Sequence, residues 1–452
     1  MQRKQSPTAR FVAVKTLCRL HHDRSSVKPL LDRAIKEASL PGNERNLTMQ
    51  LVYGVLRNRQ YLDRILQLLS KTPLAKIDLF IHQTLAVGLY QLFFLERIPQ
   101  AAAVHEMVEC CKAGRIPKRL EGFVNGILRE SIRQKDVLTV KAIRGKGGAP
   151  IVNHPEWLFA RWSSLFGQEE ALRICAANNR EPVLVLWTNV GKTTRNDFCT
   201  MLNQAGIINH LGAYAEEAVV LPEYQGAITA IPGFNEGLFQ VQDEAAQLAT
   251  GLLGPFRPGG RYLDGCAGLG GKTANLLRFA ADHALTIHAV EPEPYRRQKL
   301  QENLQRLGNP CTPIIHEKTL QQFASENPPP FDGILIDAPC SGTGVTGRHP
   351  DIRWNRCPED LLLYHQEQLS ILGHAAELLA PGGILVYATC SLEPEENQEV
   401  VKDFLAAHPA FQLTDCTPQL PDSARRFVTD LCFAPHPDAG IDGFFAARLQ
   451  RS

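Results

Sequence analysis

The spacing of apolar residues changes along this chain, and that change limits the possible folds more than any other feature. From residue 10 to residue 134, apolar side chains recur three and four positions apart, as at Leu51, Val52, Val55 and Leu56. This spacing predicts helices throughout. After Asp243, short apolar runs bounded by Gly and Pro alternate with helical segments, which predicts a doubly wound sheet of mostly parallel strands. We therefore expect an all-helical region and an α/β region in one molecule.

The chain has 452 residues, enough for two or three domains. Residues 141–150 are basic and Gly-rich and have no apolar period, so we interpret them as a linker. The segment that follows, up to about residue 235, predicts helices and several short strands. The predicted architecture is an all-helical domain over 1–140, the linker with a small α/β domain over 141–235, and a Rossmann-like α/β domain with a mixed, mostly parallel sheet over 236–452.

Several classes of protein are excluded by features that the sequence lacks. No apolar run reaches the roughly 18 residues that a membrane-spanning helix needs, and no secretory signal peptide is present. The twelve cysteines do not have the spacing of a disulfide framework, and no CxxC pair supports a structural zinc site. We expect a cytoplasmic protein with reduced thiols and no metal.

Formal charge is distributed unevenly, although the total is only +1. Residues 1–150 carry 26 Lys and Arg against 12 Asp and Glu, a net charge of +14, which leaves −13 for residues 151–452. Solvated helix faces are one explanation of the basic excess. A net charge of this size nevertheless favours a polyanionic partner for the helical region.

A Gly-rich turn, LDGCAGLGGKT at 263–273, joins a predicted strand to a predicted helix. Glycines let the backbone approach a ligand, and the helix N-terminus offers unpaired N–H groups. A phosphate-binding loop of the pattern GxxxxGK[ST] needs Gly at position 266, where Cys266 stands, so a cofactor turn is favoured over an NTPase. Glu291 ends the next predicted strand, where an acid can hold a ribose diol; a solvated carboxylate is an equally good explanation.

Two cysteines follow neighbouring predicted strands. Asp337 and Cys340 come at the end of GILIDAPC, and Cys390 comes at the end of GGILVYATC. Because the carboxyl ends of parallel strands share one edge of the sheet, these side chains should lie near the turn that contains Lys272. One such thiol is most often inert packing, but two at matched strand ends indicate nucleophilic chemistry, which needs a thiolate beside a base or a positive charge.

The segments LDGCAGLGGKT, DAPCSGTG, ATCSLEPEEN and DGFFAARL resemble, in order, spacing and strand placement, the RNA 5-methylcytosine methyltransferases that use S-adenosylmethionine. The branch of that family that methylates 16S rRNA also has a NusB-like RNA-binding domain, which VYGVLRNRQYLDRIL, GLYQLFFLERIP and FVNGILRE resemble. The resemblance covers essentially the whole chain. It implies an S-adenosylmethionine-dependent rRNA (cytosine-5-)-methyltransferase that acts on small-subunit RNA as a monomer, without a metal or a membrane.

The resemblance implies catalytic roles at the sheet edge. Cys390 is the nucleophile that adds to carbon 6 of a cytosine, and Cys340 assists product release. Asp337 hydrogen-bonds the edge of the base, helps to protonate the ring and borders the cofactor. Lys272 stabilises that carboxylate and the nearby thiolate.

Contacts with the cofactor and the RNA are implied in the same way. The methionine end of the cofactor lies against Cys266, Ala267, Gly268, Leu269, Gly270, Gly271 and Lys272. Glu291 holds the ribose hydroxyls and Glu317 lies near the adenine, with Lys318 as the competing alignment. Gly268-Leu269 replaces the family's usual Ala-Pro, which makes the turn less rigid but removes no side-chain ligand. The implied RNA contacts are Arg348, His349 and Arg353, although a surface loop with a chance basic cluster also explains them.

Two other functions are considered. In a DNA cytosine methyltransferase the Pro-Cys cysteine, Cys340, would be the nucleophile, and a separate target-recognition region would be expected. A non-catalytic RNA-binding or antitermination factor would need only the helical domain. The presence of both Cys340 and Cys390 argues against this last function.

Overall fold

The computed structural model describes residues 8–22, 26–145, 148–309 and 311–452. Its contacts divide the chain into two compact units: residues 1–180 with 346–356, and residues 181–345 with 357–452. No helix in the described ranges is both long enough and apolar enough to cross a membrane.

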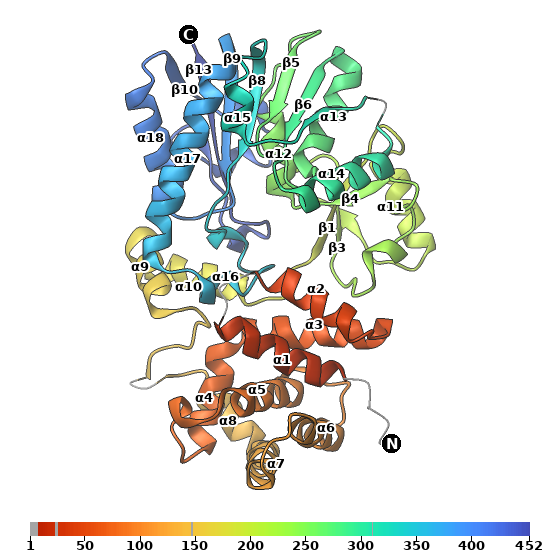
Figure 1. Cartoon of the computed structure of the whole chain (residues 1–452), viewed down its shortest axis with the longest axis vertical. Coiled ribbons are helices and arrows are strands. Elements are labelled where there is room, and N and C mark those ends of the chain that lie inside the picture. The colour runs from red at the N-terminus through yellow and green to blue at the C-terminus, as the bar shows by residue number, and fades with distance from the viewer. Residues whose placement is uncertain (1–7, 23–25, 146–147, 310) are drawn as a thin grey trace. The chain divides into compact units, whose positions relative to one another are not determined.

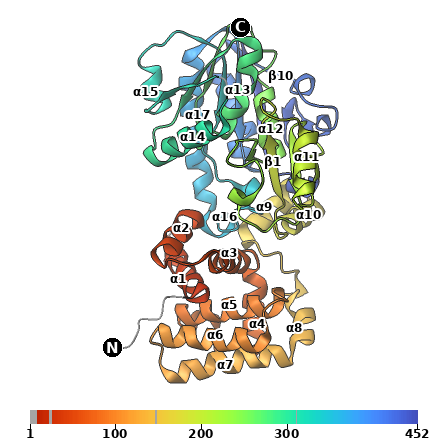
Figure 2. The same cartoon turned by 90° about the vertical axis from the view of Figure 1, so that its right-hand side faces the viewer.

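The first unit is helical, as the apolar spacing predicts (Figure 2). Its helices are α1 (Ala9–His22), α2 (Val27–Glu37), α3 (Gly42–Arg57), α4 (Arg59–Leu69), α5 (Leu79–Phe94), α6 (Gln100–Ala113), α7 (Lys118–Arg133), α8 (Lys135–Ala142), α9 (Glu156–Phe166), α10 (Gln168–Asn178) and α16 (Ile352–Asn355). Pro41, Pro99 and Pro117 cap the N-termini of α3, α6 and α7, because proline is tolerated where no intrahelical N–H bond is made. Helix α5 is apolar on all sides and contacts α1, α3, α6 and α7.

The expected linker begins inside α8. Residues 141–142 end that helix, and an isolated bridge pairs Arg144 with Pro150, while residues 146–147 lie outside the described ranges.

Residues 346–356 pack into the helical unit, although they follow the Cys340 strand in the sequence. Indole Nε1 of Trp354 donates a hydrogen bond to the carbonyl oxygen of Leu56 at 2.8 Å. The N–H of Val27 donates to Asp351 Oδ2 at 2.9 Å. These contacts link positions roughly three hundred residues apart, so no local pattern could have predicted them.

The second unit contains a small antiparallel sheet in the order β2-β3-β1-β4, formed by β1 (Leu184–Thr188), β2 (His210–Leu211), β3 (Ala218–Leu221) and β4 (Phe239–Val241). Helix α11 (Arg195–Gln204) contacts β2 and β3, and Phe198 on this helix stacks on Phe239 in a small core. The predicted small α/β fold is therefore present.

The larger sheet is mixed and mostly parallel in its centre, as predicted. In the order β7-β6-β5-β8-β9 its strands are parallel, and β13 then pairs antiparallel with β9. The strands are β5 (Arg261–Asp264), β6 (Thr286–Val290), β7 (Ile314–His316), β8 (Phe331–Asp337), β9 (Leu379–Thr389), β10 (Phe411–Thr414), β11 (Val428–Thr429), β12 (Cys432–Phe433) and β13 (Phe445–Arg451). The short strands β7, β10, β11 and β12 were not anticipated from the sequence.

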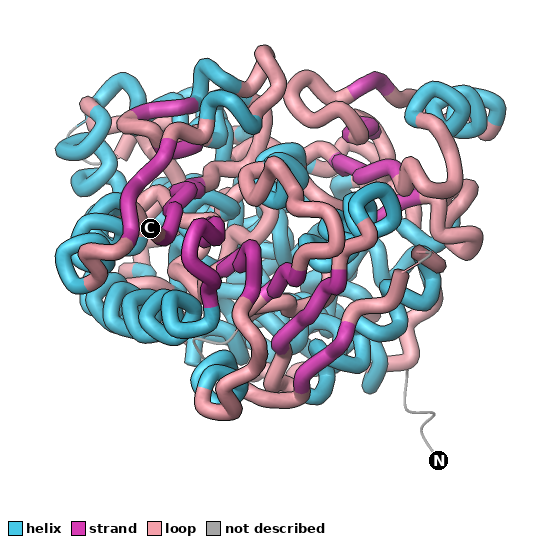
Figure 3. The backbone as a smooth tube through the Cα atoms, turned by 90° about the horizontal axis from the view of Figure 1, so that it is seen from above, coloured by secondary structure: helices cyan, strands magenta, loops and turns pink. Residues whose placement is uncertain are grey.

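Helices cover both faces of this sheet (Figures 1 and 3). They are α12 (Glu244–Gly251), α13 (Gly271–His283), α14 (Pro294–Leu307), α15 (Leu320–Ala324), α17 (Pro358–Leu378) and α18 (Gln398–Ala407). Leu335 packs in the core with α12, α13 and α14, whereas its neighbours Ile334 and Ile336 pack in the core with α15, α17 and α18. This alternation explains why β8 is an almost continuous apolar run.

The strand order also locates the place where a ligand can bind. The chain proceeds from β5 to β6 and β7 in one direction along the sheet, and from β8 to β9 in the other. Open α/β sheets bind ligands beyond the carboxyl ends of the strands at such a reversal, which here falls between β5 and β8.

Candidate active site

The Gly-rich turn after β5 has a backbone that suits close approach of a ligand. Gly270 is the N-cap of α13 with a φ of +84°, and no side chain caps the first N–H groups of this helix. A Cβ at Gly270 would lie 3.0 Å from Leu300, while a Cβ at Gly268, where φ is +55°, would meet nothing within 4 Å. The turn therefore presents backbone N–H groups beside open space.

The two cysteines meet because of the parallel register of β8 and β9. Asp337 pairs with Ala388, so Cys340 and Cys390 leave the sheet at the same edge, and their Sγ atoms are 3.2 Å apart. The N–H of Gly344 donates to the carbonyl oxygen of Cys390 at 3.0 Å. The predicted meeting of the two thiols is therefore present in the structure.

Two glycines, Gly344 and Gly443, pack closely against each other beside the loop that contains Cys390. A Cβ at Gly344 would lie 2.3 Å from the carbonyl oxygen of Gly443, and a Cβ at Gly443 would lie 2.8 Å from the Cα of Gly344. Any side chain at either position would push the two segments apart, and with them the loop that contains Cys390.

Lys272 and Asp337 form an ion pair at this edge, with 2.6 Å between Nζ and Oδ2. Nζ also lies 5.5 Å from the centre of the Phe444 ring. Burial acts to lower the pKa of Lys272, but Asp337, Asp264 and Cys390 outweigh it, and the net shift is upward. Lys272 therefore keeps its positive charge beside the two thiols.

The surroundings of Cys340 disfavour its ionisation. The hydrogen bond with Cys390, burial and the charge of Glu396 raise the pKa of Cys340 well above its usual value. Ionisation of Cys340 is therefore disfavoured in the resting site, and in its 3.2 Å contact with the Sγ of Cys390 either sulfur can be the donor.

Glu291 stands at the end of β6 with a carboxylate that is only partly satisfied. Its Oε1 accepts a hydrogen bond from the N–H of Glu293 at 2.8 Å, and no donor to Oε2 occurs in the part of the chain that the structure describes. An acceptor at this place fits a hydroxyl ligand. Together with the uncapped turn at Gly270, these residues fit a nucleoside-containing cofactor.

The sequence analysis missed two polar residues next to the turn, Asp264 and its hydrogen-bond partner Thr273. Asp264 is buried at the end of β5, where Oδ2 accepts from Thr273 Oγ1 at 2.7 Å and no side chain of the described residues donates to Oδ1. Burial raises the pKa of Asp264 to about 6. The available signal was the LDG triplet, which places an acid at the strand end.

The remaining predicted cofactor residues lie around the same edge. Glu317 follows β7, is exposed, and pairs with Arg297 at 3.0 Å. Lys318 pairs instead with Glu326. Cys266 is partly buried against the core, and Leu269, where the family usually has proline, is 48% exposed.

The predicted RNA contacts lie in the helical unit. Arg348 and His349 are partly exposed, whereas Arg353 is fully buried. The guanidinium of Arg353 donates to carbonyl or amide oxygens of Asn153, Asn178, Asn179 and Thr346 at 2.6–3.0 Å. Both terminal nitrogens of Arg353 are occupied inside the unit, and within the described residues its Nε is buried without a partner, so Arg353 is not exposed for contact with RNA.

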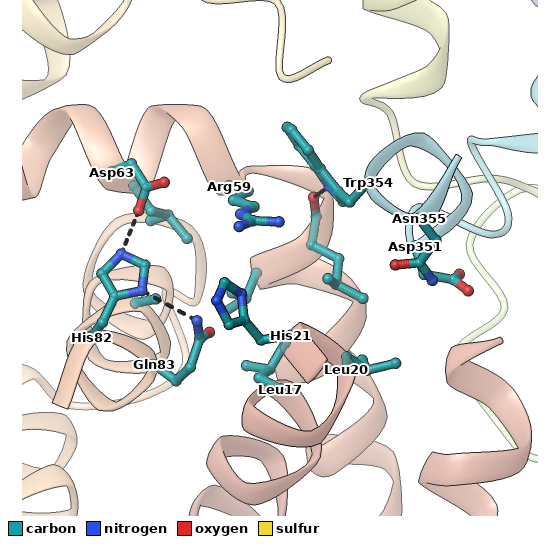
Figure 4. Close-up of a pocket in the computed structure, with 14 residues that line it drawn as sticks. Leu17, Leu20, His21, Arg59, Asp63, His82, Gln83, Asp351, Trp354 and Asn355 are labelled. Atoms are coloured by element: carbon teal, nitrogen blue, oxygen red, sulfur yellow. Dashed lines mark hydrogen bonds and ion pairs between the residues drawn. The ribbon is translucent and has the colours of Figure 1, made fainter. Parts of the chain in front are cut away.

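A cavity of about 40 Å³ lies in the helical unit between α1, α3, α4, α5 and residues 351–355 (Figure 4). His82 and Asp63 are hydrogen-bonded in its wall at 2.7 Å, and the Arg59 guanidinium lies 5.0 Å from the ring centre of Trp354. This volume holds only a few water molecules, so the cavity is no candidate for a nucleotide site.

Comparison with known families agrees with this geometry. Residues 252–450 match the family model described as 16S rRNA methyltransferase RsmB/F, residues 7–133 match the NusB family, and residues 154–226 match the ferredoxin-like domain of RsmF/B-like methyltransferases.

Individual relatives extend the match to nearly the full length. The chain is 34% identical to the probable ribosomal RNA small subunit methyltransferase B of Bacillus subtilis, over 98% of this chain and 99% of the relative. It is 37% identical to the ribosomal RNA small subunit methyltransferase B of Vibrio cholerae, over 96% and 94%.

Two solved structures from Pyrococcus horikoshii are also similar. A methyltransferase homologue is 28% identical, with a TM-score of 0.56 over 67% of this chain and 96% of that one. NSun6, solved with SFG, is 19% identical, with a TM-score of 0.57 over 66% and 98%, and at this identity the likeness shows the fold alone.

The helical region, the ferredoxin-like middle domain and the mixed sheet define a multidomain methyltransferase. The chain belongs to the RsmB/F family of 16S rRNA methyltransferases. The resemblance to the 16S rRNA branch, the RsmB (Sun/Fmu) type, is therefore confirmed, and so are the predicted fold class and enzyme class.

Proposed function

We propose that this protein transfers a methyl group from S-adenosylmethionine to carbon 5 of a cytosine in 16S rRNA, through a covalent bond between Cys390 and carbon 6. The observation that carries the proposal is the pair of thiols, 3.2 Å apart, at the strand ends that also hold the Lys272–Asp337 ion pair. With two thiols at one place, one can act as the nucleophile and the other as the proton acceptor.

The reaction needs the two thiols in sequence. The thiolate of Cys390 adds to carbon 6, which makes carbon 5 electron-rich, and the ring nitrogen takes up a proton held by the Lys272–Asp337 pair. Once Cys390 is bonded to carbon 6, the hydrogen bond that most raises the pKa of Cys340 is gone, and Cys340 can release its proton to solvent. After carbon 5 has received the methyl group, the Cys340 thiolate accepts the proton that carbon 5 loses. The bond between carbon 6 and Cys390 then breaks, and the ring proton returns to the protein.

Asp337 is placed to orient the base during these steps. Its Oδ2 is engaged by Lys272, and no hydrogen bond to Oδ1 occurs within the described residues. Oδ1 can therefore accept a hydrogen bond from the amino group of cytosine, a group that uracil lacks.

S-adenosylmethionine, when bound, supplies the methyl group on a positively charged sulfur. We propose that Cys266 to Lys272 contact its methionine end, that Glu291 holds the ribose hydroxyls and that Glu317 lies near the adenine. The support comes from the uncapped N-terminus of α13 and from the free acceptor Oε2 of Glu291.

We propose that the helical domain over 1–140 binds RNA and that the domain over 236–452 performs the chemistry, with 141–235 between them. An open groove of about 740 Å³ between α6 and α7 is lined by the basic residues Lys112, Lys118, Arg129 and Arg133 and by two acids, Glu109 and Glu121. The basic side chains of this groove suit a phosphate backbone, and we propose Arg348 and His349 as separate RNA contacts. We expect the enzyme to work as a cytoplasmic monomer.

Methyl transfer to isolated ribosomal RNA tests the proposal. We expect tritiated methyl groups from S-adenosylmethionine to enter 16S rRNA, and bisulfite sequencing to show one protected cytosine. Large-subunit rRNA and duplex DNA are the controls. Labelled DNA would favour the DNA-enzyme alternative, and no label in any nucleic acid would favour a non-catalytic RNA-binding protein.

Replacing Glu291 tests the cofactor site. Glu291→Gln keeps an acceptor for the N–H of Glu293 but removes the charged acceptor for a hydroxyl, so S-adenosylmethionine should bind roughly 10- to 100-fold more weakly. Titration calorimetry measures this, with the exposed Glu302→Gln as a matched charge control. Equal affinity of wild type and Glu291→Gln would remove Glu291 from the site.

A further inference from the structure

A buried carboxylate lies beside both cysteines and has no part in the mechanism above. Glu396 ends the short 3-10 helix η5 (Pro394–Glu396) and is 0% exposed. Its Oε1 accepts from the N–H of Ser341 at 2.7 Å and from Gln368 Nε2 at 3.3 Å. Its Oε2 accepts from the hydroxyl groups of Ser341 and Ser391.

All four of these groups act as donors toward Glu396. Burial raises the pKa of Glu396 above its usual value, and the hydrogen bonds from Ser341 and Ser391 offset only part of this shift. A carboxylate that accepts several hydrogen bonds can remain charged in the interior, whereas a protonated carboxyl would have to give up one of these acceptor roles. Glu393, also buried, is the second acid that faces it.

The serines bound by Glu396 directly follow the two cysteines in the sequence. Ser341 is next to Cys340 and Ser391 is next to Cys390, and the two hydroxyl oxygens are 3.2 Å apart. One carboxylate therefore binds both loops at equivalent positions, immediately after each thiol.

Other contacts fix the opposite side of each cysteine. Gln368 Nε2, which also reaches Glu396, donates to the carbonyl oxygen of Pro339 at 2.9 Å. The hydroxyl of Tyr387 on β9 donates to the carbonyl oxygen of Glu396 at 2.6 Å. Asn397, the next residue, accepts a hydrogen bond from Thr389 Oγ1 at 2.6 Å and donates one to the carbonyl oxygen of Ser391 at 2.9 Å.

We propose that Glu396 is a positioning residue that holds Cys340 and Cys390 at a fixed separation for the two steps of the reaction. This inference rests on the proposed function, since only a reaction that uses both thiols requires their separation to be set. Its negative charge has a second effect, because it disfavours a thiolate at Cys340.

The alternative is that Glu396 only fills the core. A buried carboxylate is a costly way to do so, because an apolar side chain of similar volume packs there without desolvating a charge. A space-filling role predicts loss of stability on substitution, but no separate effect on the rate of chemistry or on the ionisation of one thiol.

The full-length variant Glu396→Gln separates these roles. The amide keeps the volume but cannot accept at its nitrogen, so at least one loop loses its anchor, and we expect kcat to fall roughly 10- to 100-fold with little change in S-adenosylmethionine affinity. Glu399→Gln, an exposed acid on α18, is the matched control and should behave as wild type.

Alkylation of each thiol, followed by peptide mass spectrometry over a range of pH, provides a readout that does not depend on activity. Removing the charge of Glu396 should let Cys340 react with iodoacetamide at lower pH than in the wild type. Ser391→Ala keeps the carboxylate and removes one of the hydrogen bonds that Glu396 accepts, so it should lower kcat by a few fold with a smaller effect on the Cys340 profile than Glu396→Gln.

These measurements distinguish failure of the proposed function from failure of the positioning role of Glu396. If the wild type methylates no RNA, the proposed function fails, whatever the Glu396 variants do. If the wild type is active while Glu396→Gln keeps both its kcat and its Cys340 alkylation profile, the positioning role is wrong. Should Glu396→Gln not fold, full activity in both Ser341→Ala and Ser391→Ala would likewise overturn it.

Discussion

Replacing Cys390 with serine should abolish methyl transfer, lowering the rate roughly 10,000-fold or more. A serine hydroxyl is hardly ionised near neutral pH and is a far weaker nucleophile than a thiol. The Lys272 charge favours a thiolate at this position but cannot make a hydroxyl ionise. Transfer of labelled methyl groups to 16S rRNA measures the loss.

Replacing Cys340 with serine should have a different result. Without a thiolate to accept the carbon-5 proton, the methylated base stays bonded to Cys390, so a protein–RNA adduct should accumulate and survive a denaturing gel. The 3.2 Å between the two sulfur atoms makes Cys340 the partner next to that bond. The double variant, which has no nucleophile, is the control and should form no adduct.

The opposite pattern would reverse the two roles. An adduct that persists in Cys390→Ser and disappears in Cys340→Ser would make Cys340 the nucleophile, as in the DNA-enzyme alternative. Equal adduct formation in both single variants would mean that either thiol can attack carbon 6.

The meeting of the cysteines could be predicted because it depends on strand ends alone. Apolar runs identify β8 and β9, and the parallel register of Asp337 with Ala388 then brings whatever follows each strand to one edge. The Gly-rich turn was predictable for a similar reason, since its residues are contiguous and need no distant partner.

Contacts that depend on distant partners could not be predicted in this way. The role of Glu396 arises from a turn that brings its carboxylate to two serines, one of them 55 residues earlier in the chain. The sequence predicts Arg353 at the RNA because it is basic and lies near the predicted site, but it is buried, and its terminal nitrogens donate to residues 153 and 178–179 of the helical unit. Charge and position in the sequence do not reveal burial when the burying segment is far away.

Removing the Lys272 ammonium should have the second largest effect on the reaction. Lys272→Met leaves Asp337 without its ion-pair partner and removes the positive charge that favours a thiolate at the sheet edge. We expect the single-turnover rate of methyl transfer to fall roughly 100- to 1,000-fold, as when a preorganised charge is removed from an active site. Lys272→Arg keeps the charge with a different shape and should recover part of the rate.

The charge of Lys272 determines how its contribution to the rate depends on pH. Because the folded pKa of Lys272 is raised, its charge is present throughout the neutral range, and the stability that it adds is lost only as pH rises through that raised value. Rapid-quench measurements should therefore show no fall in the wild-type rate through deprotonation of Lys272 between pH 6 and 9. This range lies roughly below the ordinary lysine pKa. If Lys272→Met instead weakens S-adenosylmethionine binding and leaves the rate with saturating cofactor unchanged, Lys272 belongs to the cofactor turn alone, and another group must favour the thiolate at Cys390.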